Sequence, residues 1–65
     1  MVPAKEKWAE LLAKMREDRY LSAAEQAKQI GVSYNTLKKI IDGEIQSISL
    51  PILRRIHDFL EDQGY

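Results

Sequence analysis

Residues 21–43 read LSAAEQAKQIGVSYNTLKKIIDG and contain two short helical patterns separated by Gly31. Ser22, followed three residues later by Glu25, matches a capping box, in which two free backbone amides at a helix start gain partners. Gly31 tolerates the left-handed conformation that commonly ends a helix, because it has no Cβ. The first half of the stretch therefore predicts a helix over residues 23–30 that ends in a sharp turn.

The second half of the stretch predicts another helix over residues 34–42, because Ser33 can cap its start and Asp42-Gly43 can end it. Apolar residues at helical spacing give each helix an inner face, made by Ala24, Ala27 and Ile30 in the first and by Leu37, Ile40 and Ile41 in the second. The outer face of the second helix carries Tyr34, Asn35 and Lys38, and more obliquely Thr36 and Lys39. No acidic residue lies between positions 26 and 41, so we expect a locally positive face.

Two longer helical patterns flank this stretch, over residues 4–18 and 50–62. The first has an apolar stripe that we assign to the core: Trp8, Leu11, Leu12 and Met15. The last can be capped by Ser49, and its apolar face consists of Ile52, Leu53, Ile56, Phe59 and Leu60. We expect Tyr20 and Leu21 to pack against the start of the second helix. Residues 44–48 are expected to form a loop, since a lone strand would have no partner for its hydrogen bonds.

Composition narrows the classes of function. The chain has 65 residues, enough for one domain over residues 1–65. It has no cysteine, which excludes disulfides, a thiolate nucleophile and a Cys-bound zinc. The single histidine, His57, falls among polar positions, and no catalytic set or phosphate-binding loop is evident, so we expect no metal, no cofactor and no enzymatic activity. No apolar run approaches the roughly 18 residues of a membrane span, which favours a cytoplasmic protein.

The central stretch also carries a family motif: a small residue, a glycine and an apolar residue at Ala27, Gly31 and Val32, then inward apolar residues and Asp42-Gly43. It resembles the DNA-binding core of the Cro/cI-like repressors, the XRE family of prokaryotic and phage transcription regulators. The resemblance spans about residues 5–62 and implies an all-α, compact, four- to five-helix lambda-repressor-like domain containing a helix-turn-helix. Ala23 departs from the family, since many members have a Gln there that contacts phosphate. Gln26 replaces a usual apolar residue, and the family's final short helix is not evident.

The resemblance implies sequence-specific binding of double-stranded DNA by a transcription regulator, most simply a repressor, with residues 33–41 in the major groove. The candidates for base contact are Tyr34, Asn35, Lys38, Lys39 and Thr36. The candidates for phosphate contact are Ser22, Ala23, Ser33, Ser47 and Ser49. Because one small domain covers few base pairs, we also expect a homodimer, formed on DNA or through a C-terminal region outside this sequence.

Two other interpretations remain open. Lys plus Arg equals Asp plus Glu at ten each, so the chain lacks the overall positive charge of many DNA-binding domains. Together with Ala23 and an exposed Tyr34, this neutrality favours a protein-interaction module, which would bind an antirepressor or a regulator's partner domain. A purely structural helical domain is the third alternative. Salt dependence separates the first two hypotheses, because phosphate contacts release counterions and an apolar protein interface does not.

Overall fold

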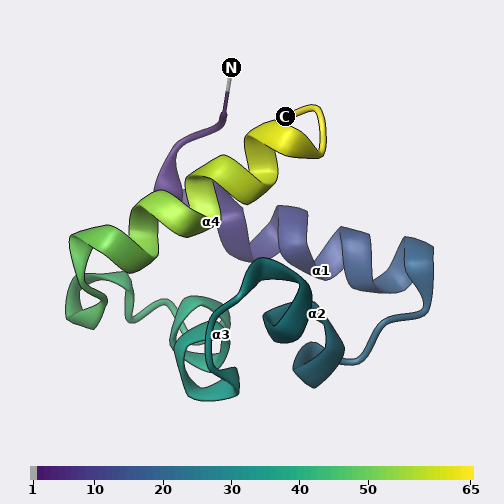
Figure 1. Ribbon diagram of the computed structural model, residues 1–65, viewed down its shortest axis with the longest axis horizontal. Helices are drawn as coiled ribbons and strands as arrows, with labels where there is room; N and C mark the ends of the chain where they lie inside the picture. Colours follow the sequence, from purple (N-terminus) through teal and green to yellow (C-terminus); the bar gives the residue numbers. More distant parts are fainter. Residues whose placement is uncertain (1) are drawn as a thin grey trace.

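The computed structural model describes residues 2–65, which form four α-helices and two short 3-10 turns, with no strand in that range (Figure 1). The elements are η1 (Lys5–Lys7), α1 (Trp8–Arg19), α2 (Ala23–Ile30), α3 (Tyr34–Ile41), η2 (Ile45–Ser47) and α4 (Leu50–Asp62). In the view of Figure 1, α1 and α4 lie above α2 and α3. The predicted all-helical class is confirmed, with four helices and a loop between α3 and α4.

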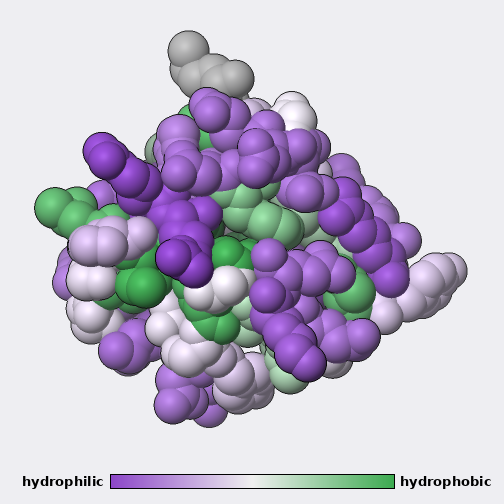
Figure 2. All heavy atoms as spheres, in the orientation of Figure 1, coloured by the Kyte–Doolittle hydropathy of each residue, from purple (hydrophilic) through white to green (hydrophobic). Residues whose placement is uncertain are grey.

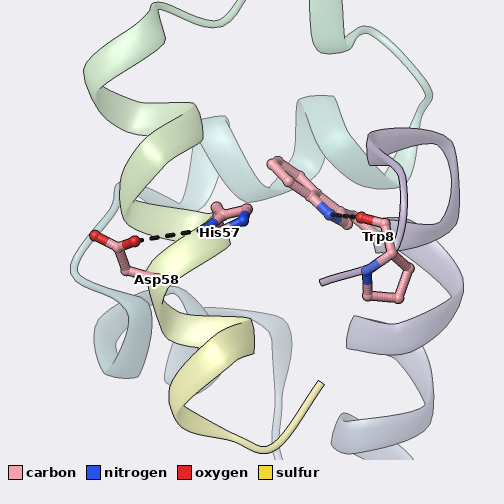
Figure 3. A network of polar contacts seen from close by, with 4 residues as sticks. Trp8, His57 and Asp58 are labelled. Carbon is pink, nitrogen blue, oxygen red and sulfur yellow. Dashed lines mark hydrogen bonds and ion pairs between the residues drawn. The ribbon is translucent and has the colours of Figure 1, made fainter. Parts of the chain in front are cut away.

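The first helix begins later than the sequence pattern predicts, at Trp8 instead of about residue 4. The indole Nε1 of Trp8 donates a hydrogen bond to the Pro3 carbonyl at 3.1 Å (Figure 3). An α-helix beginning at residue 4 would use that carbonyl for the Lys7 amide, which instead donates to Ala4 at 2.9 Å. The tighter 3-10 turn η1 therefore stands in place of the expected first α-turn, and the Pro3 carbonyl accepts from the indole and not from the Lys7 amide.

All four helices contribute to one hydrophobic core. Its buried members are Trp8, Leu12, Met15, Ala27, Ile30, Leu37, Ile40, Ile48, Leu53, Ile56 and Leu60. Leu11, Ile52 and Phe59, which the sequence also assigns to inner faces, are only partly buried against this core. Ile41 is predicted to lie inside, but it is 41% exposed at the last residue of α3.

The inner face of α2 differs from the prediction. Ala24 is exposed, and the stripe that faces the core consists of Ala23, Gln26, Ala27 and Ile30. Gln26 has no exposed surface, although it is polar. Its Oε1 accepts a hydrogen bond from Arg16 Nη1 at 2.7 Å, and its Nε2 donates to the Leu12 carbonyl at 2.9 Å. This side chain therefore joins α2 to α1 while both of its polar ends are satisfied.

The turn between α1 and α2 also departs from the prediction. Tyr20 was expected to pack against α2, but it is 94% exposed and only Leu21 is partly buried. Tyr20 adopts a left-handed conformation with φ of 54°, and the amides of Tyr20 and Leu21 both donate to the Arg16 carbonyl. This geometry ends α1 and directs the tyrosine side chain into solvent, because the chain must reverse within residues 20–22 before α2 begins.

Candidate functional site

The turn between α2 and α3 closes through Gly31, as the sequence predicts. Gly31 has φ of 89°, a left-handed value that a residue with a Cβ rarely adopts. The amides of Gly31 and Val32 both donate to the Ala27 carbonyl, at 2.9 and 3.0 Å. Ala27 is 2% exposed, and its small side chain allows α2 and α3 to approach closely. The relative orientation of the two helices is thus set within a few residues.

A side chain from α4 also holds this turn. Arg55 Nη1 donates to the Gly31 carbonyl at 3.1 Å, although the two residues are 24 positions apart. A Cβ built on Gly31 would lie 2.8 Å from the same Nη1 atom, but this atom is the far end of a flexible, exposed side chain that can move aside, so glycine is needed mainly for its backbone angle. Sequence reasoning missed Arg55 because no local pattern signals a contact over this separation. The guanidinium also places positive charge at the carboxyl end of α2, which is favourable for the helix dipole.

The start of α2 is a complete capping box. Ser22 Oγ accepts from the Glu25 amide at 3.1 Å, and the Ser22 amide donates to Glu25 Oε1 at 3.0 Å. The hydrogen bond from the Ser22 backbone, followed by the one from its hydroxyl, lowers the pKa of Glu25 from its ordinary value of 4.5. The carboxylate therefore stays ionised at neutral pH, next to a helix start where negative charge is stabilising.

The start of α3 is capped by Ser33. Its Oγ accepts from the Thr36 amide at 3.1 Å, and it lies 2.9 Å from Thr36 Oγ1. Thr36 is only partly exposed, and its hydroxyl faces the cap. The Thr36 hydroxyl therefore already has a hydrogen-bond partner at the helix cap. It is less available for contact with a DNA base than the other candidate side chains of α3.

The remaining candidates for base contact share the solvent face of α3. Asn35, Lys38 and Lys39 are exposed, and Tyr34 is 50% exposed. Helical spacing places Asn35, Lys38 and Lys39 on the side opposite Leu37 and Ile40, which are fully buried. Tyr34 lies at the edge of this face, beside the groove between α2 and α3. No acidic residue belongs to α3, so the face has two lysine charges and an amide with both donor and acceptor atoms.

The candidates for phosphate contact lie at three helix starts. Ser22 and Ala23 begin α2, Ser33 precedes α3, and Ser49 precedes α4. Ser49 occupies the N-cap position but makes no side-chain capping bond, contrary to the simplest expectation. Ser47 is also exposed, and its hydroxyl donates to the Glu44 carbonyl at 2.9 Å. At the starts of α2 and α3, the Ser22 and Ser33 hydroxyls already accept hydrogen bonds, so the remaining free amides are the donors best placed for an anion.

Residues 2–65 contain no group of three or more metal-ligating side chains, and no helix among them is long and apolar enough to cross a membrane. His57 is exposed, as predicted, and its Nδ1 lies 3.5 Å from Asp58 Oδ1 (Figure 3). Both side chains belong to α4 and lie on its solvent side, so their contact is a surface pair.

Comparison with families of known proteins gives a match over most of the chain. A family model described as a helix-turn-helix domain matches residues 9–61, which include α2, the Gly31 turn and α3. No curated protein and no solved structure matches the chain. The matched residues extend from the first turn of α1 almost to the end of α4, so the family covers most of the sequence. The chain therefore belongs to the helix-turn-helix domain family, whose members typically bind DNA and are not enzymes.

Proposed function

We propose that this chain is the sequence-specific DNA-binding domain of a transcription regulator, a repressor of the Cro/cI-like type, and that residues 1–65 act as one unit. The observation that carries the proposal is the solvent face of α3, where Tyr34, Asn35, Lys38 and Lys39 are exposed and no acid is present. The major groove of DNA admits one α-helix, and the first turns of such a helix reach the base edges.

The chemistry of this face suits base recognition. The Asn35 amide can bind adenine through two hydrogen bonds, and Lys38 or Lys39 can donate to the acceptors of guanine. Tyr34 can contact a thymine methyl group or a phosphate. The free amides at the starts of α2 and α3, together with the loop that holds Ser47 and Ser49, would bind phosphates and set the orientation of α3.

The test is a titration of the isotope-labelled protein with random-sequence duplex DNA at two salt concentrations, followed by amide chemical shifts. We expect shifts that concentrate on α3 and weaken steeply with salt, by about 0.9 log unit in affinity per phosphate contact for each log unit of salt. Reversing the charge of Lys38 and Lys39 to Glu should weaken binding at least about tenfold, since each lysine lost removes an attraction and adds a repulsion.

Lys14→Glu is the matched control, because this exposed lysine lies on α1 and outside the proposed interface. A charge reversal there should change affinity far less than Lys38→Glu alone. Equal losses from the two single variants would mean that binding follows total charge and not α3, which would contradict the proposal.

A second candidate function is a protein-interaction module. A shallow groove of about 370 Å³ lies between α2 and α3, with Ala24, Val32 and Tyr34 in its lining. Its apolar lining and the formal net charge of zero favour a protein partner such as an antirepressor. The same titration separates the two functions, since absence of any DNA-induced shift at low salt would contradict DNA binding and favour the protein-interaction module.

A further inference from the structure

The groove between α2 and α3 also has polar residues in its lining. Glu25 and Lys28 come from α2, and Tyr34 comes from α3. Lys28 is exposed, and its aliphatic stem can lie along the apolar part of the lining while its ammonium group stays in water. In Figure 2, hydrophilic and intermediate side chains cover most of the lower part of the molecule, where Figure 1 places α2 and α3. This surface therefore suits a polar ligand.

Lys28 carries a positive charge that no carboxylate of the described chain neutralises. Within residues 2–65 it makes no ion pair, although Glu25 stands three positions before it on the same helix, a spacing at which such pairs form. The Glu25 carboxylate instead accepts from the Ser22 amide at 3.0 Å, which holds it at the start of α2. Lys28 can therefore bind an anion without giving up another contact.

Tyr34 adds a neutral hydrogen-bond donor at the same groove. Its side chain makes no hydrogen bond within residues 2–65, so the hydroxyl is free to donate. The residue is half covered beside Ala24 and Val32, which limits the directions that the ring can take. One ammonium group and one phenolic hydroxyl at a single groove are donors of the kind that bind phosphate oxygens.

The place of the groove relates it to the DNA backbone. Tyr34 is the first residue of α3, and the groove adjoins the face on which Asn35 and Lys38 are exposed. In a helix-turn-helix complex the recognition helix enters the major groove, and the helix before it crosses the backbone. With α3 in the major groove, the outer side of α2 meets the phosphates beside it. Lys28 is the lysine that α2 presents there.

From the unpaired lysine, the free hydroxyl and their common groove, we propose that Lys28 and Tyr34 together bind one phosphate of the DNA backbone. The ammonium group supplies charge, and the hydroxyl supplies a directed hydrogen bond that helps to fix the register of α3. In this arrangement Tyr34 contacts the phosphate and not a thymine methyl group. The inference rests on the proposed function, because the phosphate belongs to the bound DNA.

The first experiment measures the affinity for a labelled random-sequence duplex at several salt concentrations. Lys28→Gln should lower affinity at low salt at least about threefold, and it should reduce the slope of log affinity against log salt by about 0.9, because one phosphate contact is lost. Glutamine suits an exposed position in a helix, so this variant should fold, and circular dichroism checks that it does.

Lys14→Gln is the matched control, because it is the same substitution at an exposed lysine on α1, outside the proposed contact. Its salt slope should equal that of the parent chain. If Lys28→Gln keeps the parent slope, or if the two variants lower the slope equally, Lys28 does not bind a phosphate and the proposal is overturned.

The second experiment removes only the hydroxyl, with Tyr34→Phe. We expect a loss in affinity of about three- to tenfold with an unchanged salt slope, because a neutral donor releases no counterion. In the double variant with Lys28→Gln, the loss should be smaller than the product of the two single losses, since either change already weakens the shared contact. A double loss equal to that product, or no loss from Tyr34→Phe, contradicts a shared phosphate.

The third experiment separates a phosphate from a thymine methyl group. Tyr34→Ala is compared with the parent on duplexes that contain thymine and on the same duplexes with uracil in its place. A phosphate contact gives the same fold loss on both, because uracil changes only the base. A loss that becomes smaller on the uracil duplexes would show that Tyr34 contacts the methyl group, and it would overturn the proposal.

These results also distinguish failure of the inference from failure of the proposed function. If the parent binds DNA with a steep salt dependence and Lys28→Gln behaves like Lys14→Gln, the groove is not a phosphate site and the DNA-binding function stands. If the parent binds no duplex at low salt, both are contradicted, and the groove is better explained as part of a protein-interaction surface.

Discussion

Gln26 offers the sharpest test of how this small fold is held together. Gln26→Ala removes a hydrogen bond from Arg16 at 2.7 Å and a hydrogen bond to the Leu12 carbonyl at 2.9 Å. A bond from a charged donor contributes about 1.5–3 kcal/mol and a neutral one about 1 kcal/mol. Arg16 is only partly buried and can turn to water, so we use the lower end for it. With the lost side-chain packing, the expected loss in free energy of unfolding is about 3 kcal/mol.

This loss is large for the chain. A domain of 65 residues has a free energy of unfolding of about 3–10 kcal/mol. Each kcal/mol shifts the melting temperature by about 4–8 °C in a domain of this size, so Gln26→Ala should melt at least about 12 °C below the parent. Helical circular dichroism followed against temperature and urea gives both quantities.

Two further variants show whether the hydrogen bonds or the volume matter. Gln26→Leu retains most of the side-chain volume and removes both hydrogen bonds. The Leu12 carbonyl remains within the backbone hydrogen bonding of α1, so we expect a smaller loss of about 1 kcal/mol in the free energy of unfolding. Gln29→Ala is the matched control, because it is the same substitution at an exposed position of the same helix. The reasoning is refuted if Gln26→Ala lowers stability by less than about 1 kcal/mol, or if Gln26→Leu lowers it more than Gln26→Ala does.

Three other predictions concern the turns and caps. Gly31→Ala should destabilise by about 1–2 kcal/mol in urea unfolding because of left-handed strain, and Arg55→Ala in that background should recover none of it, since the arginine tip can move away from the added Cβ and its loss removes the hydrogen bond to the Gly31 carbonyl. Tyr20→Gly should raise stability by about 0.5–1 kcal/mol, because the left-handed φ of 54° is strained for tyrosine; an unchanged melting temperature would argue against strain. The pKa of Glu25 is lowered in the folded state, so its ionised carboxylate stabilises the fold above pH 4.5, and this contribution is lost as the pH falls below that value. Ser22→Ala should therefore reduce the dependence of the free energy of unfolding on pH in this acidic range.

Much of the fold follows from interactions between near neighbours in the sequence. The capping box of α2 joins residues three positions apart, and Ser33 caps α3 over the same distance. The left-handed closure at Gly31 depends on one residue that lacks a Cβ. Because these causes are local, the sequence predicts α2, its turn, α3 and the solvent face of α3, on which Asn35 and Lys38 are exposed.

The errors occur where a side chain finds a hydrogen-bond partner that the polarity pattern does not reveal. Hydrophobic periodicity treats Gln26 as a solvent residue and thereby rotates the inner stripe of α2 onto Ala24, whereas hydrogen bonds from α1 allow the glutamine to be buried. The start of α1 is misplaced because the Trp8 indole takes the carbonyl of Pro3. Hydrophobic periodicity reports only the polarity of each residue, so it does not indicate which polar side chains are buried with hydrogen-bond partners.

The sequence by itself determined α2, α3, their serine caps and the tight turn between them, since each depends on residues within about one helical turn. Only the tertiary structure decided that Arg55 holds the Gly31 carbonyl from 24 residues away, and that Ile41 and Leu50 are exposed beside one groove. The orientation of α3 and the surface next to it depend on how the four helices pack. Packing is a cooperative property of all the side chains together, and it is not encoded in any short stretch.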